Sequence, residues 1–241
     1  IVLPRILDTS HLEDVTRTAI QFLLNGSVKA HYPTPDIEKV AKRNRRIGLG
    51  FMGLHEFMLL NGYKYEWFPK LEKFLSVWQG VSDDEATTYA AKMYEPTPIN
   101  RRAVAPTGTI SILGQTSSGI EPIFCISYKR RYINGDKHLW QYVVDPTAKR
   151  LLSLGVPAKE IEDAYTLAHD IRRRLEVQAK VQEFTDMAIS STINLPKYGE
   201  PGNNDLDTFA QLMVEFLPRL KGITTYPNES RPGQPLVRVD L

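Results

Sequence analysis

Short apolar runs alternate with helical segments along most of this 241-residue chain. The apolar runs are Ile1–Leu3, AVA at 103–105, PIFCISY at 122–128, STINL at 191–195 and GITTY at 222–226. Helices that alternate with short strands are typical of a parallel α/β sheet or barrel. About five or six strands are too few for a closed barrel, which usually takes eight or more. We therefore expect the missing strands to come from another chain.

Capping residues, prolines and glycines set the expected ends of the helices. The capping box Ser10–Glu13 predicts a helix start, and Asn25-Gly26 predicts the end of that helix. Pro69 is expected to open a helix that runs toward Met93. Further helices are expected within GFMGLHEFMLLNG at 50–62, between Asp145-Pro146 and Gly155, and along residues 167–188.

Composition narrows the classes of function. The 30 basic and 28 acidic residues give a net charge of +2, which does not support a nucleic acid partner. No apolar run approaches the roughly 18 residues of a membrane span, so we expect no membrane association and a cytoplasmic location. The single cysteine, Cys125, excludes a disulfide within the chain and is interpreted as a small buried thiol on a strand. Because the first residue is Ile1, the chain is interpreted as a fragment, a trimmed piece or a processed product.

Residues 48–53 read GLGFMG, which matches the G-x-G-x-x-G pattern of dinucleotide-binding folds. A site of that kind needs a buried apolar strand before the first glycine. The preceding AKRNRRI at 41–47 carries four cations, which a strand buried on both faces cannot hold. We therefore interpret Gly48, Gly50 and Gly53 as positions of close packing at a helix start. A nicotinamide site is the alternative, and it predicts NADH binding that Gly50→Val abolishes.

The stretch most typical of a ligand site is AVAPTGTISILGQTSSGIEP at 103–122. In it, an apolar strand end runs into a turn with three hydroxyls and a glycine. A helix that starts near Thr109 would direct free N–H groups and the positive end of its dipole at an anion. The predicted phosphate-binding residues are Pro106, Thr107, Gly108, Thr109, Ile110 and Ser111, with a second hydroxyl cluster at 116–119. The alternative is that these residues only cap helices and form turns.

Five motifs in a fixed order carry a resemblance to a known family. They are RRIGLGFMGL, PTGTIS, SSGIEPIF, SSTINLP and GITTYP, and together they resemble the C-terminal half of the ribonucleotide reductase large subunit. The similarity is greatest to the adenosylcobalamin-dependent, class II enzymes, and it covers essentially all of residues 1–241. It implies that the chain is the C-terminal segment of a ten-stranded α/β barrel domain. It also implies that the loop at 106–111 holds the phosphates of a ribonucleoside di- or triphosphate.

The resemblance also implies a radical chemistry. In this family a cysteine thiyl radical removes the 3′-hydrogen of the ribose, two further cysteines supply electrons, and adenosylcobalamin is the radical source in class II. The finger loop and the redox cysteines have no match in this sequence, so no catalytic residue is assigned, and we expect an N-terminal reductase segment or chain as partner. Tyr226 stands where class I enzymes have two adjacent tyrosines, which favours the cobalamin class. The resemblance leaves the oligomeric state open.

Other interpretations stay open beside this one. A noncatalytic nucleotide- or phosphate-binding module that keeps the loop at 106–111 and has lost the reaction is the alternative function. His55-Glu56 is half of an H-E-x-x-H zinc motif, but Leu59 stands at the second histidine position, so no metal site is predicted. The basic run KRRY at 129–132 is interpreted as a solvated or ion-paired face in preference to a surface for an anionic substrate.

Overall fold

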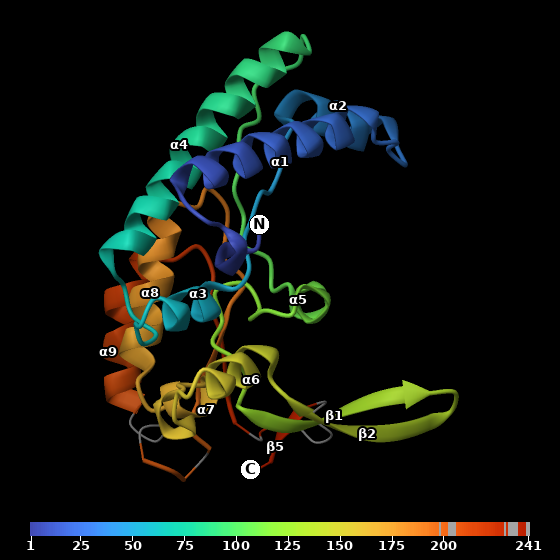
Figure 1. The fold of residues 1–241 in the computed structure, drawn as a ribbon. Helices are drawn as coiled ribbons and strands as arrows, with labels where there is room; N and C mark the ends of the chain where they lie inside the picture. The colour runs from blue at the N-terminus through green and yellow to red at the C-terminus, as the bar shows by residue number, and fades with distance from the viewer. Residues whose placement is uncertain (198, 202–205, 229, 231–235, 240–241) are drawn as a thin grey trace.

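The computed structural model describes residues 1–197, 199–201, 206–228, 230 and 236–239. Its outline is curved, with α1, α2 and α4 at one end and a projecting β1–β2 hairpin at the other (Figure 1). The α-helices are α1 Thr9–Lys29, α2 Pro35–Asn44, α3 Leu54–Leu60, α4 Pro69–Lys92, α5 Gly108–Gly114, α6 Pro146–Ser153, α7 Ala164–Leu167, α8 Ile171–Glu183 and α9 Leu206–Phe216. The 3₁₀ helices are η1 Leu3–Arg5, η2 Ala158–Glu160 and η3 Leu217–Arg219, and the strands are β1 Ser127–Asn134, β2 Lys137–Val144, β3 Thr192–Leu195, β4 Thr224–Pro227 and β5 Leu236–Arg238.

Five segments of the chain form an array of parallel neighbours. Their pairings, in chain order, are Val2 with Met52, Leu49 with Arg102, Val104 with Ile189, and β3 with β4. Backbone bonds such as Leu49 N to Arg101 O at 2.8 Å and Ser190 N to Val104 O at 2.9 Å hold the array together. Helices connect each segment to the next, as parallel neighbours require. The predicted parallel α/β arrangement is therefore confirmed, although the segment at 49–52 was not among the predicted strands.

A second, antiparallel sheet was not expected. It has the strand order β2-β1-β5, and β1 and β2 form a hairpin that turns at Gly135, where φ is +59°. The predicted strand at 122–128 is wrong, because only its last two residues enter β1. The hairpin had a signal in the sequence: Gly135-Asp136, which lies between the paired residues Asn134 and Lys137, is a pair that two-residue hairpin turns favour.

The predicted helix ends are partly right. Pro69 opens α4 and Asp145 caps α6, as expected. The predicted cap of the first helix is wrong: Asp8, not Ser10, caps α1, and that helix runs through Asn25-Gly26 to Lys29. The single helix predicted over 167–188 is divided in two, because Asp170 caps α8 three residues after α7 ends. The sequence KYGEPGNND at 197–205 predicts a loose, linker-like segment, and it falls mostly outside the described residues.

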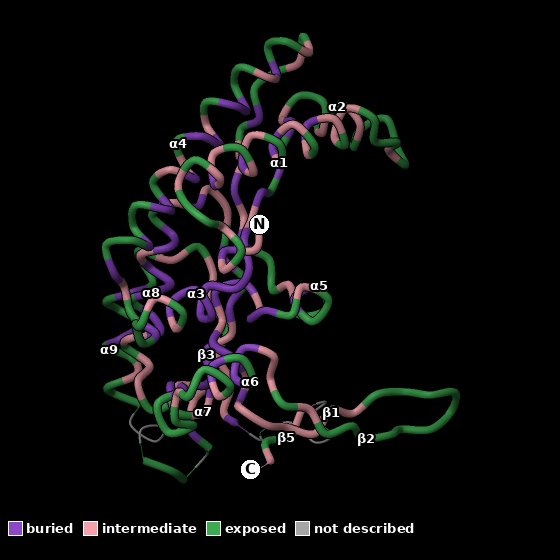
Figure 2. The backbone as a smooth tube through the Cα atoms, in the orientation of Figure 1, coloured by how far each residue is buried: buried purple, intermediate pink, exposed green. Residues whose placement is uncertain are grey.

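The main core lies between the parallel array and helices α1, α3 and α4. Buried positions follow the inner faces of these elements, whereas the hairpin is largely exposed (Figure 2). Phe51 in the array and Trp78 in α4 meet edge to face, with ring centroids 5.2 Å apart. The buried apolar residues of α1 are Leu12, Ile20 and Leu24. Burial of side chains of this size, at roughly 1.5–3 kcal/mol each, stabilises this part of the fold.

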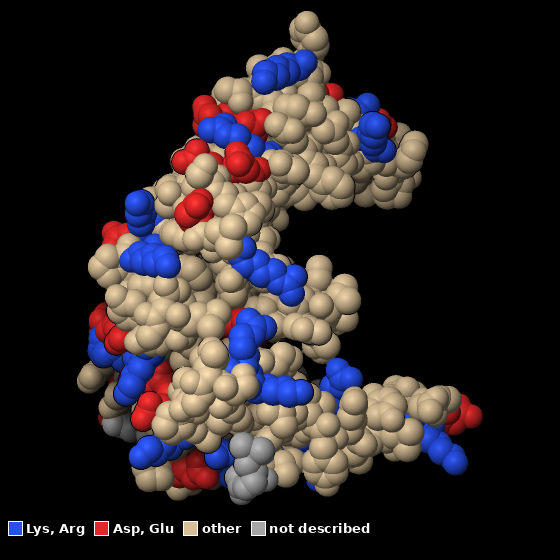
Figure 3. All heavy atoms as spheres, viewed as in Figure 1, with Lys and Arg blue, Asp and Glu red and all other residues tan. Residues whose placement is uncertain are grey.

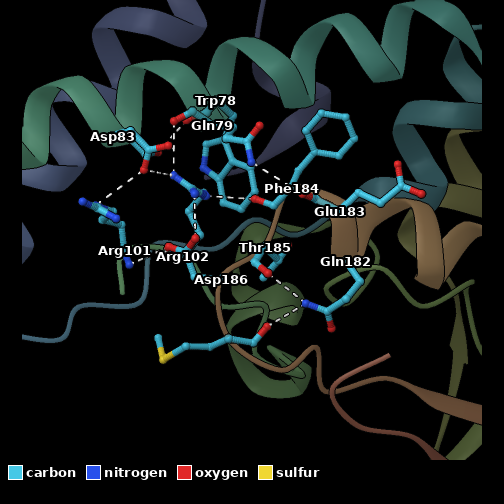
Figure 4. Close-up of polar contacts among 12 residues, drawn as sticks. Trp78, Gln79, Asp83, Arg101, Arg102, Gln182, Glu183, Phe184, Thr185 and Asp186 are labelled. Carbon is cyan, nitrogen blue, oxygen red and sulfur yellow. Dashed lines mark hydrogen bonds and ion pairs between the residues drawn. The ribbon is translucent and has the colours of Figure 1, made fainter. Parts of the chain in front are cut away.

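Arg102 joins three parts of the chain within this core (Figure 4). Its guanidinium donates at 2.7 Å to Asp83 in α4 and at 2.7 Å to Asp186, which follows α8. It also donates to the carbonyl oxygens of Gln79 at 3.2 Å and Phe184 at 2.9 Å. The side chain is only 3% exposed, so these acceptors replace the water that the cation loses on folding.

Removal of this buried cation is predicted to destabilise the fold. Arg102→Leu leaves Asp186 without its partner, and the free energy of unfolding should fall by about 3–5 kcal/mol, the cost of breaking a buried ion pair from one side. Urea unfolding measures the change. Arg172→Leu is the control, because its ion pair with Glu215 is about half exposed on both sides and its loss should change stability little. Equal losses in the two variants would contradict the assigned role of Arg102.

Candidate functional site

The loop at 106–111 follows directly from the third segment of the parallel array. Helix α5 begins at Gly108, one residue before the expected start near Thr109. Thr107 precedes the helix in the left-handed conformation, with φ at +54°, which is uncommon for a residue with a side chain. Its Oγ1 accepts a hydrogen bond from the N–H of Gly119 at 2.7 Å. The loop and the second hydroxyl cluster at 116–119 therefore form one unit.

The predicted phosphate-binding residues differ in what they can offer a ligand. The Thr107 hydroxyl accepts the bond from Gly119, and Ser111 is buried with its Oγ bonded to the Gly108 carbonyl at 3.1 Å and to Ser118 Oγ at 2.9 Å. Pro106, Gly108, Thr109 and Ile110 are exposed. Among the described residues no hydrogen bond from the Thr109 side chain is found. The first N–H groups of a helix also have no partner within it, so these amides, like the Thr109 hydroxyl, are available as hydrogen-bond donors.

The glycines of the GLGFMG stretch serve packing. A β-carbon on Gly50 would lie 2.3 Å from the Ala103 carbonyl oxygen, and one on Gly53 would lie 2.5 Å from Thr116 Oγ1. Gly53 has φ at +86° and precedes α3, and its N–H donates to the Ser117 carbonyl at 2.8 Å. Close packing is confirmed, but only Gly53 lies at a helix start, whereas Gly48 and Gly50 lie in the second parallel segment and face Ala103. These contacts also position the 116–119 cluster beside α5.

A cavity of about 560 Å³ opens next to the loop. Gly108 and Ser111 of α5 line it together with the cluster at 116–118. Polar side chains from other parts of the chain complete the lining, among them Glu121, Arg130, Asp145, Arg174, Asn194 and Asn228. The molecule is hollowed between α2 and the hairpin, and Lys and Arg side chains lie along this hollow (Figure 3).

Two carboxyl groups on the cavity wall have raised pKa values. Burial raises the pKa of Glu121, whose Oε1 accepts a hydrogen bond from the N–H of Thr192 at 2.6 Å. Burial also raises the pKa of Asp145 to about 6, although its carboxylate accepts bonds from the first N–H groups of α6. Both carboxyl groups therefore bind a proton more readily than exposed carboxyl groups do.

His55 and Glu56 do not form a metal site. His55 is fully buried, its Nδ1 accepts from the Ile123 N–H at 3.1 Å, and desolvation lowers its pKa to about 3. Glu56 pairs with Arg150 and accepts from the Thr147 hydroxyl at 3.3 Å. In the described part of the chain, no group of three or more His, Cys, Asp or Glu side chains is placed to hold a metal ion.

Cys125 and the basic run at 129–132 lie near the cavity but differ in their contacts. Cys125 is buried, its thiol donates to the Ser127 carbonyl at 3.1 Å, and burial raises its pKa to about 12, so it stays protonated. The prediction of a small buried thiol is confirmed, although the residue is not on a strand.

Within the basic run, Arg130 lines the cavity and donates to Gln141 at 3.1 Å, a placement that the interpretation as a solvated face missed.

Sequence reasoning missed the far wall of the cavity. Glu121 stands in the quoted SSGIEPIF motif, but nothing in its spacing shows that it faces a ligand. Arg174 lies in the run DIRRRLE, which reads as the polar face of a helix. Asn194 and Asn228 come from the ends of neighbouring parallel strands, and their side-chain amides bond to each other at 2.8 Å. Polar residues at adjacent strand ends were the available signal.

Comparison with known proteins identifies the family. The family description "Ribonucleotide reductase, barrel domain" matches residues 1–70 and 99–226, most of the chain. The chain therefore belongs to the ribonucleotide reductase barrel-domain family. The five parallel segments are half of the ten strands that the resemblance implied. No helix among the described residues has the length and apolar character to cross a membrane.

The similar proteins are longer than this chain. A vitamin B12-dependent ribonucleoside-diphosphate reductase from Mycobacterium tuberculosis is 29% identical over 95% of the chain and 37% of its own length. A vitamin B12-dependent ribonucleoside-diphosphate reductase from Thermoplasma acidophilum is 26% identical over 95% of this chain and 34% of the length of that reductase. A solved B12-dependent, class II ribonucleotide reductase superposes with a TM-score of 0.78 at 16% identity, covering 95% of this chain and 36% of that one. The chain thus spans little more than a third of these relatives.

The buried His55 is predicted to make stability fall in acid. Its folded pKa of about 3 lies below the ordinary value of 6.5, so the unfolded chain takes up the proton first. Stability should fall as pH drops from about 6.5 toward 3, by up to about 1.4 kcal/mol per pH unit. His55→Asn should lose this slope in urea unfolding at pH 4.5–7. Protonation of Asp145 below pH 6 raises stability instead. Because wild type and His55→Asn both contain Asp145, its contribution cancels when their unfolding free energies are subtracted. Parallel pH profiles would contradict the prediction.

Proposed function

We propose that residues 1–241 are the C-terminal segment of the barrel domain of a ribonucleotide reductase, and that this segment binds the phosphates of the ribonucleotide substrate. The observation that carries the proposal is the loop at 106–111 beside the 560 Å³ cavity. Cavities of about 300–1,000 Å³ with a few convergent polar groups are typical of small-molecule sites. Free amides at the start of α5 and the exposed Thr109 hydroxyl would bind the phosphates, and the rest of the cavity would take the nucleoside.

The parallel array supports a partner segment. Val2 pairs with Met52, so the first member of the array has one paired edge among the described residues. Unpaired edges of a sheet expose backbone N–H and C=O groups that another strand can pair. In the proposal, the N-terminal reductase segment completes the barrel from this edge. It also supplies the radical and redox cysteines, so this chain holds the substrate while the partner reacts with it, in the cytoplasm.

Adenosylcobalamin is proposed as the cofactor of the complete enzyme, because the similar reductases are named as vitamin B12-dependent. When bound, this cofactor supplies the radical that starts the reaction. Of the described residues that line the cavity, none is a histidine or a cysteine, the side chains best suited to ligate a cobalt ion. We therefore assign no cobalamin contact to this chain. Its proposed share of the mechanism is to orient the ribonucleotide and to exclude water from the cavity.

A noncatalytic nucleotide-binding module is the second candidate function. It is favoured by one observation: the only cysteine of the sequence, Cys125, is buried and stays protonated. Both candidates predict nucleotide binding at 106–111. They differ in whether addition of an N-terminal reductase segment produces deoxyribonucleotides.

The proposal predicts that ribonucleotide reduction needs both this chain and an N-terminal segment, and that it depends on the Thr109 hydroxyl. The 241-residue chain, a purified N-terminal reductase fragment, adenosylcobalamin and dithiothreitol should together reduce CDP or CTP. Thr109→Val removes a hydrogen bond to a charged phosphate, worth about 1.5–3 kcal/mol, so kcat/KM should fall about tenfold or more. Thr18→Val on α1 is the control, since its hydroxyl bonds only the Asp14 carbonyl, and it should be unchanged. Nucleotide binding without any reduction would favour the noncatalytic module. Reduction by the chain alone would contradict the need for a partner.

A further inference from the structure

Arg174 differs from the other buried arginines of the described chain. Three arginines are almost fully buried: Arg45 and Arg174 at 3% exposure and Arg102 at 2%. Arg45 pairs with Glu95 at 2.6 Å, and Arg102 pairs with Asp186 at 2.7 Å. Among the described residues, no carboxylate oxygen lies within 4 Å of the Arg174 guanidinium, the distance that defines an ion pair. Buried charges are normally paired, but the charge of Arg174 acts on Glu121 only from beyond ion-pair distance. Arg174 therefore lacks a contacting carboxylate among the described residues.

The contacts of Arg174 hold it at the cavity wall. Its Nη2 donates to the Thr192 carbonyl at 2.7 Å and lies 3.5 Å from Ser191 Oγ. The guanidinium carbon lies 5.1 Å from the centre of the Tyr65 ring. In the described residues the Nε and Nη1 groups have no hydrogen-bond partner. The side chain is therefore fixed from one side, and its remaining donors are available to whatever occupies the cavity that it lines.

A second arginine of the same cavity also has a free donor. The Nε of Arg130 is buried and has no partner in the part of the chain that the structure describes, while its Nη2 donates to Gln141 at 3.1 Å. Glu121 and Asp145 are the acidic residues of the lining, and burial raises the pKa of both. Glu121 accepts from the Thr192 N–H, and Asp145 accepts from the first turn of α6. Both carboxylates thus already have donors of their own, whereas each arginine keeps a donor that has no acceptor among the described residues.

We propose that Arg174, assisted by Arg130, binds a phosphate group of the nucleotide at a point of the cavity separate from the 106–111 loop. This inference rests on the proposed function, because it names a second contact for the same ligand. Phosphate oxygens fit the guanidinium geometry, which offers two parallel N–H donors. The ligand would then be held at two points, with its phosphates between the amides of α5 and the arginines of the far wall.

Calorimetric binding of pyrophosphate, CDP and cytidine to the 241-residue chain tests this inference. Arg174→Gln should weaken the binding of pyrophosphate and CDP about tenfold or more, because a charge-assisted bidentate contact is lost. Arg174→Lys keeps the positive charge but not the two parallel N–H donors of the guanidinium, so it should lose less affinity. Arg172→Gln on the same helix removes an exposed cation and should bind within about twofold of wild type. Circular dichroism checks that each variant is folded.

The pattern across variants separates the two proposals. If Arg174→Gln weakens CDP binding and Thr109→Val does not, Arg174 is a ligand contact and the phosphate assignment of the loop fails. If only Thr109→Val weakens it, the loop stands and the inference on Arg174 is overturned. Wild-type protein that binds no pyrophosphate also overturns it. If Arg174→Gln does not fold, Arg174→Lys decides: affinity equal to wild type for both phosphate ligands would contradict a bidentate contact.

Discussion

The buried guanidinium of Arg102 is the interaction on which the rest of the structure depends. It belongs to the third of five parallel segments, and it connects that segment to α4 on one side and to the turn after α8 on the other. Its position over the Trp78 ring, 5.8 Å from the centroid, ties the polar network to the apolar core. Since the 106–111 loop begins two residues after Val104 of the same segment, the placement of this segment also fixes the starting point of the loop.

The site follows from close backbone packing around that segment. Gly50 lets the second segment approach Ala103, and Gly53 lets the start of α3 contact the 116–119 cluster. The cluster in turn donates the Gly119 N–H to Thr107, which turns the chain into α5. Loop, cluster and helix start are therefore positioned by backbone contacts, and the Thr109 hydroxyl is left for a ligand. The far wall is built separately, from α8 and the ends of β3 and β4.

The sequence predicted the features that depend on local chemistry. Alternating apolar runs predicted the parallel array, Pro69 and Asp145 predicted two helix starts, and the turn at Pro106–Ser111 predicted the loop beside the cavity. Contacts between residues far apart in the chain could not be predicted from the sequence. Arg174 and Arg172 occur in one run of three arginines, yet one is buried at the cavity wall and the other is half exposed, because helix orientation decides which side faces inward. The hairpin was missed because the basic residues of β1 hid the alternation of a strand, although Gly135-Asp136 marked its turn.

The most direct test of the account is to observe which backbone amides respond to a phosphate ligand. Titration of the ¹⁵N-labelled chain with CDP, followed by heteronuclear NMR, reports each amide separately. The account predicts the largest shifts at Gly108, Thr109 and Ile110, with smaller changes along the cavity wall and none at the exposed end of α4. Shifts confined to residues 48–53, or spread over the surface without saturation, would contradict a nucleotide site at the start of α5.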